Sequence, residues 1–414
     1  MKPGLIRTEI FLLIVVFLGR ASQAIDSEPS GTVPFIFDDN RVFAQLDFVR
    51  ADGTLRKVLA FVDLGTPALV LDKKLHEELQ VDESKAVIFR VGHLEMKVDS
   101  SAVETDTELG VTGPYGKRTV PVEAVLSGSV LTNYELVVDY AKRTLMVAQA
   151  NTLKSTGDAV PCRVNEKTGM VSITTEIDGR PYALAVDTGS AYSWVREDVA
   201  ERWTKAHPDW ERGKGAVGEA NMQSRTGGAQ ARATILRLPE IKLGSLSLKQ
   251  VGALGIAPEA PPIPPAPGQS KVEGSFFDWY SKKAPETVIG WLGGNVLRGF
   301  RLMIDFPRRT TYWERVSDLD PHELDQVGVT LEKRSDGYFI AGIAEKSGKP
   351  TVAAVRVGDK LIQVDNVLLS SATRGAGSLV VLPDVLPHLM MPVRPVVPAL
   401  RAPVVQMMSN AAIP

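Results

Sequence analysis

The chain has 414 residues, a length that predicts two to four domains. Its 47 Lys and Arg residues nearly balance its 49 Asp and Glu residues, and the net charge is −2. Because both signs are mixed along the chain, the composition argues against a nucleic acid or an anionic membrane surface as partner. The single cysteine, Cys162, excludes an intramolecular disulfide and is expected to be a small core side chain.

Residues 1–24 have the pattern of a signal peptide. Lys2 and Arg7 precede an apolar run over residues 10–18, and small residues follow up to Ala24. Arg20 ends the run far short of the length that spans a bilayer. We therefore expect export to the periplasm or the extracellular space, with no stable membrane span after cleavage.

Residues 32–150 are expected to form a first β-rich lobe. Runs such as VPFIFDD, VFAQLDFV and KVLAFVDLG are alternating or β-branched, and Gly, Pro and Asp-Gly pairs separate them, as in hairpins. Within the stretch 59–71, LAFVDLGTPALVL, the apolar sequence is interrupted by Asp63-Leu64-Gly65-Thr66.

A link over residues 151–162 is expected to lead into a second β-rich lobe, residues 163–316. This part contains VSITTEIDG, YALAVDTG and ATILRL. In LAVDTGSAYSWV, residues 184–195, the polar group Asp187-Thr188-Gly189-Ser190 is set into an apolar run. A carboxylate inside a core is costly, so its presence there indicates a function.

The two lobes are related by an internal repeat. Residues 124–147 align without a gap with residues 290–313, and 76 positions separate Asp63 from Asp139 where 118 separate Asp187 from Asp305. Much of the excess lies near the Pro-rich stretch 257–270, which cannot belong to a sheet interior. The expected fold is therefore all-β, with two related lobes. Asp139 and Asp305 are interpreted as surface or turn carboxylates at strand ends.

Two related lobes that each present one Asp can bring the two carboxylates face to face across a pseudo-two-fold axis. Carboxylates about 3 Å apart share one proton, so one acts as a general base on water and the other as an acid on the scissile carbonyl. No metal or cofactor is needed for this chemistry. The five histidines are scattered, and no Gly-x-Ser-x-Gly motif is present, which argues against zinc-peptidase and serine-hydrolase sites.

With these residues the chain resembles the aspartic peptidases, in particular the bacterial retropepsin-like proteins with two lobes in one chain. The resemblance implies that Asp187 and Asp63 are catalytic and that the substrate is a peptide or an unfolded protein. It also implies a flap over the cleft, for which residues 110–118 with Tyr115 at the tip are the candidate. The implied active-site loops comprise Thr188, Gly189 and Ser190 in the second lobe and Leu64, Gly65 and Thr66 in the first.

The first-lobe motif departs from the family pattern. Thr188 is implied to brace the two loops through its hydroxyl, whereas Leu64 stands at the equivalent position and cannot donate that hydrogen bond. Ser127 stands where the second lobe has Gly293. Two alternatives therefore remain: a catalytically impaired peptide-binding protein of the same fold, and a homodimer that uses only Asp187 from each chain.

Residues 325–382 are expected to form a smaller β domain that resembles a PDZ domain, although its last elements are hard to find. The resemblance implies that a C-terminal peptide is bound by strand addition at the loop Gly328, Val329, Thr330 and Leu331. The tail, residues 383–414, is rich in Pro and almost uncharged, and is expected to be unstructured.

Overall fold

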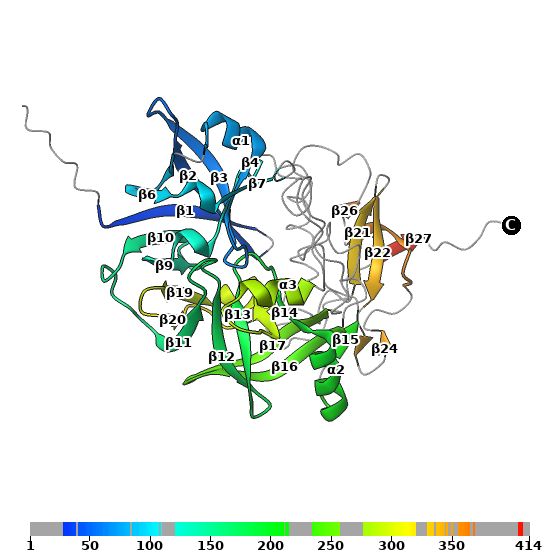
Figure 1. Cartoon of the computed structure of the whole chain (residues 1–414). Helices are drawn as coiled ribbons and strands as arrows, with labels where there is room; N and C mark the ends of the chain where they lie inside the picture. The colour runs from blue at the N-terminus through cyan, green and yellow to red at the C-terminus, as the bar shows by residue number, and fades with distance from the viewer. Residues whose placement is uncertain are drawn as a thin grey trace, which may run out of the picture.

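The computed structural model describes residues 28–38, 40–82, 85–106, 109, 121–210, 212–214, 234–256, 276–319, 329–334, 337–343, 345–346, 349–350, 355–364, 367–368 and 405–408. The expected signal peptide lies outside the described residues. The fold is all-β, as predicted, with short helices between strands (Figure 1). Among the described residues, no helix has the length and apolar character needed to cross a membrane.

The first lobe extends from β1 to β10. Strand β2 shows why the sequence folds this way: Val42, Ala44, Leu46 and Phe48 are buried, while Gln45 between them is exposed. The elements are β1 Ser30–Asp38, β2 Arg41–Val49, β3 Leu55–Val62, β4 Leu69–Asp72, α1 Lys73–Glu78, β5 Val87–Val91, β6 Leu94–Val98, the 3₁₀ helix η1 Ser100–Ala102, β7 Val103–Asp106, β8 Ala124–Leu126, the 3₁₀ helix η3 Gly128–Val130, β9 Tyr134–Asp139 and β10 Thr144–Gln149.

The second lobe extends from β11 to β20 and repeats the order of the first. Its β16–β17 hairpin is longer than any hairpin among the described residues of the first lobe. The elements are β11 Asp158–Val164, β12 Val171–Ile177, β13 Arg180–Val186, β14 Ser193–Arg196, α2 Glu197–Ala206, β15 Arg212–Lys214, β16 Thr234–Leu243, β17 Leu246–Ile256, α3 Phe276–Lys283, β18 Gly290–Leu292, α4 Gly294–Leu297, β19 Phe300–Asp305 and β20 Thr310–Arg315.

A six-stranded antiparallel sheet joins the lobes, in the order β1, β10, β9, β19, β20, β11. At its centre β9 pairs with β19, and Val137 lies opposite Met303. Leu136 lies opposite Ile304, and Val138 opposite Leu302. These strands belong to the two aligned repeats, so the repeat corresponds to a pseudo-two-fold axis between β9 and β19. Figure 1 shows the other strands of the first lobe at the top of the view and those of the second lobe at the lower right.

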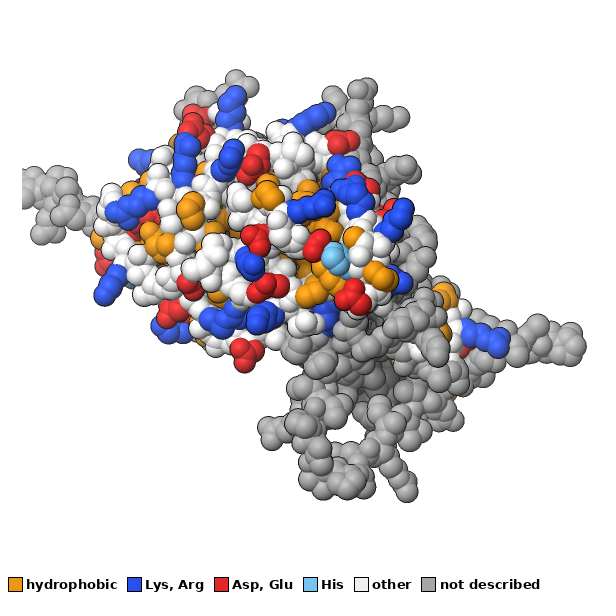
Figure 2. Space-filling model, turned by 90° about the horizontal axis from the view of Figure 1, so that it is seen from below, with side chains coloured by type: hydrophobic (Ala, Val, Ile, Leu, Met, Phe, Trp, Pro, Cys, Tyr) orange, Lys and Arg blue, Asp and Glu red, His pale blue; other side chains and the backbone are white. Residues whose placement is uncertain are grey.

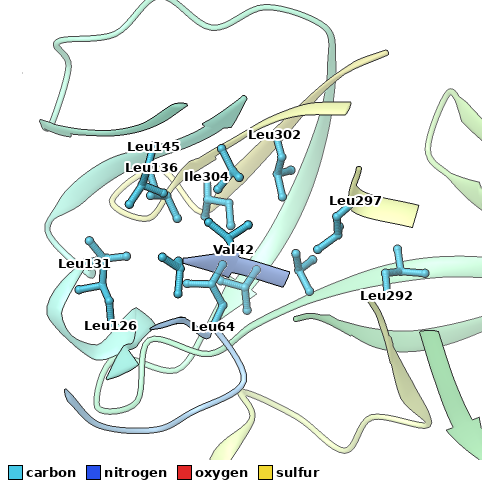
Figure 3. Close-up of a cluster of buried hydrophobic side chains, with 14 of the residues drawn as sticks. Val42, Leu64, Leu126, Leu131, Leu136, Leu145, Leu292, Leu297, Leu302 and Ile304 are labelled. Carbon is cyan, nitrogen blue, oxygen red and sulfur yellow. The ribbon is translucent and has the colours of Figure 1, made fainter. Parts of the chain in front are cut away.

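One apolar core continues through the sheet from lobe to lobe. Figure 3 shows side chains from both lobes in a single cluster, with Val42 and Leu64 from the first lobe and Leu292 and Leu302 from the second. All four are fully buried. Burial of a leucine side chain of this kind contributes roughly 1.5–3 kcal/mol, so the lobes stabilise each other through this cluster.

Several details differ from the sequence-based expectation. Asp139 and Asp305 do end strands at turns, where they accept hydrogen bonds from the N–H groups of Lys142 and Arg308, but both carboxylates are buried rather than on the surface. Strand β11 begins at Asp158, so the last five residues of the expected link, 158–162, belong to a strand. Cys162, by contrast, is buried and free, as expected of a small core side chain.

Beyond the lobes, the described residues form a small sheet and a short hairpin. The strands are β21 Val329–Arg334, β22 Gly337–Ile343, β23 Glu345–Lys346, β24 Lys349–Pro350, β25 Lys360–Val364, β26 Val367–Leu368 and β27 Val405–Met408. Strand β27 pairs with β25 although it comes from the tail, where the sequence predicted no structure. Figure 2 shows acidic and basic side chains interspersed on the face of the molecule in view.

Candidate active site

The two Asp-containing loops are built in the same way. In the first lobe β8 lies between β3 and β4, parallel to one and antiparallel to the other, and β18 lies in the same way between β13 and β14. The Asp63 N–H donates to the Leu126 carbonyl at 2.9 Å, and the Asp187 N–H donates to the Leu292 carbonyl at 3.0 Å. Each Asp therefore directly follows the last residue of a buried strand, and the two positions are equivalent in the two lobes.

The motif glycines bring the two loops together across the lobe boundary. A Cβ added to Gly65 would clash with the Asp187 carboxylate, and one added to Gly189 would clash with the Asp63 carboxylate. Each carboxylate thus lies against the glycine of the other lobe, where only glycine leaves enough room. The structure brings Asp63 and Asp187 of one chain together, and we call this pair the dyad.

Hydrogen bonds hold both carboxylates, but the two lobes differ. The N–H groups of Gly65 and Gly189 each donate to the Oδ1 of their own Asp at 2.8 Å. In the first lobe, the Thr66 hydroxyl donates to Oδ2 of Asp63 at 2.7 Å. In the second lobe, Ser190 donates its N–H to Oδ1 of Asp187 at 3.2 Å, while its hydroxyl donates to the Tyr192 carbonyl at 2.8 Å. The Ser190 hydroxyl therefore does not bond to Asp187, in contrast to the Thr66 hydroxyl on Asp63.

The brace between the loops is one-sided. The hydroxyl of Thr188, which is fully buried, donates to the Val62 carbonyl at 2.8 Å and accepts from the Leu64 N–H at 3.2 Å. Thr188 thus links the second-lobe loop to two backbone groups of the first. Leu64 is also fully buried and fills the core beside Leu126 and Val42 (Figure 3). The missing hydroxyl at position 64 is replaced by apolar packing.

The surroundings of the dyad favour retention of one proton. Burial raises the pKa of Asp63, although the hydrogen bonds from Thr66 and Gly65 and the charge of Arg41 lower it. Burial and then the nearby charge of Asp63 raise the pKa of Asp187 well above its usual range. Two facing carboxylates in such a place hold one proton between them, which is the state required for combined acid and base catalysis.

Two residues of the site were not found from the sequence. Arg41, at the start of β2, is buried, and its Nε donates to the Gly189 carbonyl at 3.1 Å. Tyr280, on α3, is buried too, and burial followed by the charges of Asp187 and Asp63 raises the pKa of its hydroxyl. A lone Arg after a turn and a Tyr in an amphipathic helix have no sequence signal that marks them as site residues.

Other predicted site residues are only partly described. Tyr115 and Gly328 lie outside the described residues, whereas Val329, Thr330 and Leu331 lie in β21. Ser127 is fully buried, and its hydroxyl lies 2.7 Å from that of Ser129. Within the described residues, no group of three or more His, Cys, Asp or Glu side chains could hold a metal ion.

A family comparison bears on the second-lobe part of this site. Residues 173–263, which include Asp187-Thr188-Gly189-Ser190, match the family model described as aspartyl protease. The chain is also similar to the crystal structure of aspartic proteinase from Irpex lacteus, with 14% identity, 69% of this chain and 97% of that chain covered, and a TM-score of 0.37. No curated protein matches the chain. The family match supports an aspartic-peptidase function.

Proposed function

We propose that this chain is an exported endopeptidase that hydrolyses peptide bonds with the Asp63–Asp187 dyad and an activated water. The observation that carries the proposal is the crossed arrangement of the loops, in which each motif glycine lies against the carboxylate of the other lobe. A buried carboxyl pair without function is costly, because burial removes both groups from water and one of them must stay protonated to avoid repulsion.

In the proposed reaction the dyad begins with one proton. The ionised carboxylate takes a proton from water while the water oxygen forms a bond to the scissile carbonyl carbon, and the other carboxyl gives its proton to the carbonyl oxygen. The product is a neutral gem-diol. Its C–N bond then breaks as the first carboxyl protonates the leaving nitrogen, and the second takes back a hydroxyl proton, which restores the carbonyl. The dyad ends in its initial protonation state.

The substrate is proposed to be an extended peptide or an unfolded protein. The test is cleavage of an unfolded protein over a range of pH, with and without a statine-type transition-state analogue, and with Asp187→Asn as the control. We expect cleavage that the analogue inhibits and that the Asn variant lacks. Binding of the analogue or of peptides without any cleavage by the parent chain would instead support the peptide-binding alternative.

Export and peptide binding by the C-terminal unit are separate parts of the proposal. Export is supported by the N-terminal sequence pattern over residues 1–24. Peptide binding is supported by the position of β21 at the end of its sheet, where β22 is its one partner strand among the described residues. An added strand at that edge would complete the hydrogen bonds of β21. Binding of C-terminal peptides to the full chain, measured by calorimetry with β21 variants, tests this part.

A further inference from the structure

The lobes touch through two equivalent hairpin tips. At the β1–β2 turn, Asn40 has a φ of 57° and its carbonyl lies against Gly294 of the second lobe. At the β11–β12 turn, Gly169 has a φ of 66° and lies against Gly128 of the first lobe. Gly128 and Gly294 occupy equivalent positions of the internal repeat. The two contacts are therefore related by the pseudo-two-fold axis. Both tips also have a residue with left-handed backbone conformation.

The residue after each tip breaks this symmetry. It is Met170 in the second lobe, fully buried in an apolar cluster, and Arg41 in the first. Arg41 is only 2% exposed, and its Nε donates to the carbonyl of Gly189, the residue that lies against the Asp63 carboxylate. The first lobe thus has a buried cation at the position where the second lobe has a thioether. A buried charge is costly unless it is paired, so this position indicates an electrostatic role.

The hydroxyls of the two loops show the same asymmetry. Thr66 donates to Oδ2 of Asp63, whereas the Ser190 hydroxyl donates to a backbone carbonyl instead of to Asp187. A hydrogen bond to a carboxylate favours the ionised form, and so does a nearby cation. The Thr66 hydroxyl and the Arg41 cation act on Asp63. Among the described residues, the donors on Asp187 include the Ser190 N–H and the Tyr280 hydroxyl, which are both neutral.

We propose that Arg41 is a positioning residue of the dyad: together with Thr66 it keeps Asp63 ionised, so that Asp63 takes the proton from water and Asp187 carries the proton given to the carbonyl oxygen. This assignment rests on the proposed function for its role in catalysis. The protonation asymmetry itself is a property of the folded chain and can be measured without turnover.

The titratable groups that face the dyad are consistent with this assignment. Asp63 is faced by Arg41 from β2 and by Asp187 and Tyr280 from the other lobe. Asp187 is faced by Asp63, by Tyr140 after β9 and by Tyr280 on α3. Burial and then the charge of Asp187 raise the pKa of both tyrosine hydroxyls, which stay neutral at the pH of the experiment. Arg41 therefore supplies a positive charge that these phenols cannot replace.

The test compares Arg41→Gln, which is neutral but can still donate to the Gly189 carbonyl, with Arg41→Lys, which keeps the charge. Arg41→Met, which copies Met170, is a second neutral variant in case one fails to fold. The matched control is Arg298→Met, because Arg298 also contacts the hairpin tip, through a 3.2 Å hydrogen bond to the side chain of Asn40. Two readouts are taken: the pH profile of kcat/KM and the thermal unfolding midpoint as a function of pH.

In the activity profile, loss of the cation should move the acidic limb, which reports the first deprotonation of the coupled pair, upward by about one pH unit. The pKa of the dyad is raised in the folded chain, so the folded state binds more protons than the unfolded state above the ordinary carboxyl range, and stability is lost as pH rises through the raised pKa. The coupled pair titrates in two steps, and the step at the lower pH should move to higher pH in the neutral variants.

We expect Arg41→Lys and Arg298→Met to keep both curves of the parent chain. If the neutral variants leave both curves unmoved, or if Arg41→Lys shifts them as far as Arg41→Gln does, the proposal is overturned. If the parent chain cleaves nothing but the unfolding step still moves in the neutral variants, the role of Arg41 stands and the proposed peptidase function fails. The two failures are therefore distinguishable.

Discussion

At the scale of single residues, Asp187 is the most direct test of the dyad. Asp187→Asn removes one ionisable member and keeps its volume, so turnover should fall by about 10³-fold or more while the chain stays folded. Because burial and the charge of Asp63 disfavour the ionised Asp187, the unfolding midpoint at neutral pH should not decrease. Steady-state kinetics and thermal unfolding measure both. Asp52→Asn, at an exposed turn, is the control and should match the parent chain.

Thr188 tests the one-sided brace. Thr188→Val keeps the shape of the side chain but leaves the Val62 carbonyl and the Leu64 N–H without their hydroxyl partner in a buried place. An unsatisfied buried polar group costs roughly 1–3 kcal/mol, so we expect a loss of about 2 kcal/mol or more in the free energy of unfolding, measured with urea. Thr204→Val, at a half-buried helix position whose hydroxyl makes only a solvent-exposed hydrogen bond, should change it by less than about 0.5 kcal/mol. Equal stability of the two variants would contradict the brace.

Leu64 shows what a sequence motif can and cannot reveal at this scale. The motif located both aspartates, both glycines and the bracing Thr188, because these residues are fixed by the turn that they must form. The apolar packing that replaces the hydroxyl at Leu64, the partner of the Ser190 hydroxyl and the burial of Arg41 depend on groups far away in the chain. The Tyr192 carbonyl and the Gly189 carbonyl become partners only once the fold has formed.

At the scale of elements, β9 and the link between the lobes are joined by one buried carboxylate. Glu135 is fully buried and accepts hydrogen bonds from the N–H groups of Asn151, Thr152 and Leu153 at 2.9, 3.2 and 2.7 Å. Glu135→Gln would turn one acceptor oxygen into a donor facing these N–H groups. We expect a loss on the order of 3 kcal/mol in the free energy of unfolding, because charge-assisted hydrogen bonds are removed in a buried place.

The control for Glu135 is Glu166→Gln. Glu166 forms a 2.7 Å ion pair with Arg309, but its side chain is 80% exposed. A surface ion pair of this kind contributes at most about 1 kcal/mol, so urea unfolding should separate the two variants clearly. If Glu135→Gln were as stable as Glu166→Gln, the link would be held by contacts other than this carboxylate.

The strands themselves were predictable to a large extent. Alternating runs such as VFAQLDFV follow the two-residue period of a half-buried strand, and the repeat predicted that β9 and β19 are equivalent. The start of β11 inside the expected link and the tail strand β27 were not predictable in this way. Their pairing is decided by distant partners, β20 and β25, and not by the local pattern.

At the scale of the whole molecule, the crossed loops make a single chain sufficient for the dyad. The two glycine contacts, the Thr188 hydrogen bonds, the Arg41 hydrogen bond and the β9–β19 pairing all join the first lobe to the second within one chain. A homodimer that used Asp187 twice would need the first lobe to be displaced from all of these contacts. The geometry therefore favours the single-chain enzyme over the homodimeric alternative left open by the sequence.

Asp63→Asn, measured at two protein concentrations, tests this conclusion. If Asp63 is the partner of Asp187, Asp63→Asn should lower kcat/KM about as much as Asp187→Asn does, and the double variant should be little worse, because residues that act as a unit are strongly non-additive. The specific activity of the parent chain should not change on dilution. A homodimer predicts the reverse, since Asp63→Asn would be nearly silent and dilution would dissociate the active species. A silent Asp63→Asn variant with concentration-dependent activity would therefore assign catalysis to two copies of Asp187.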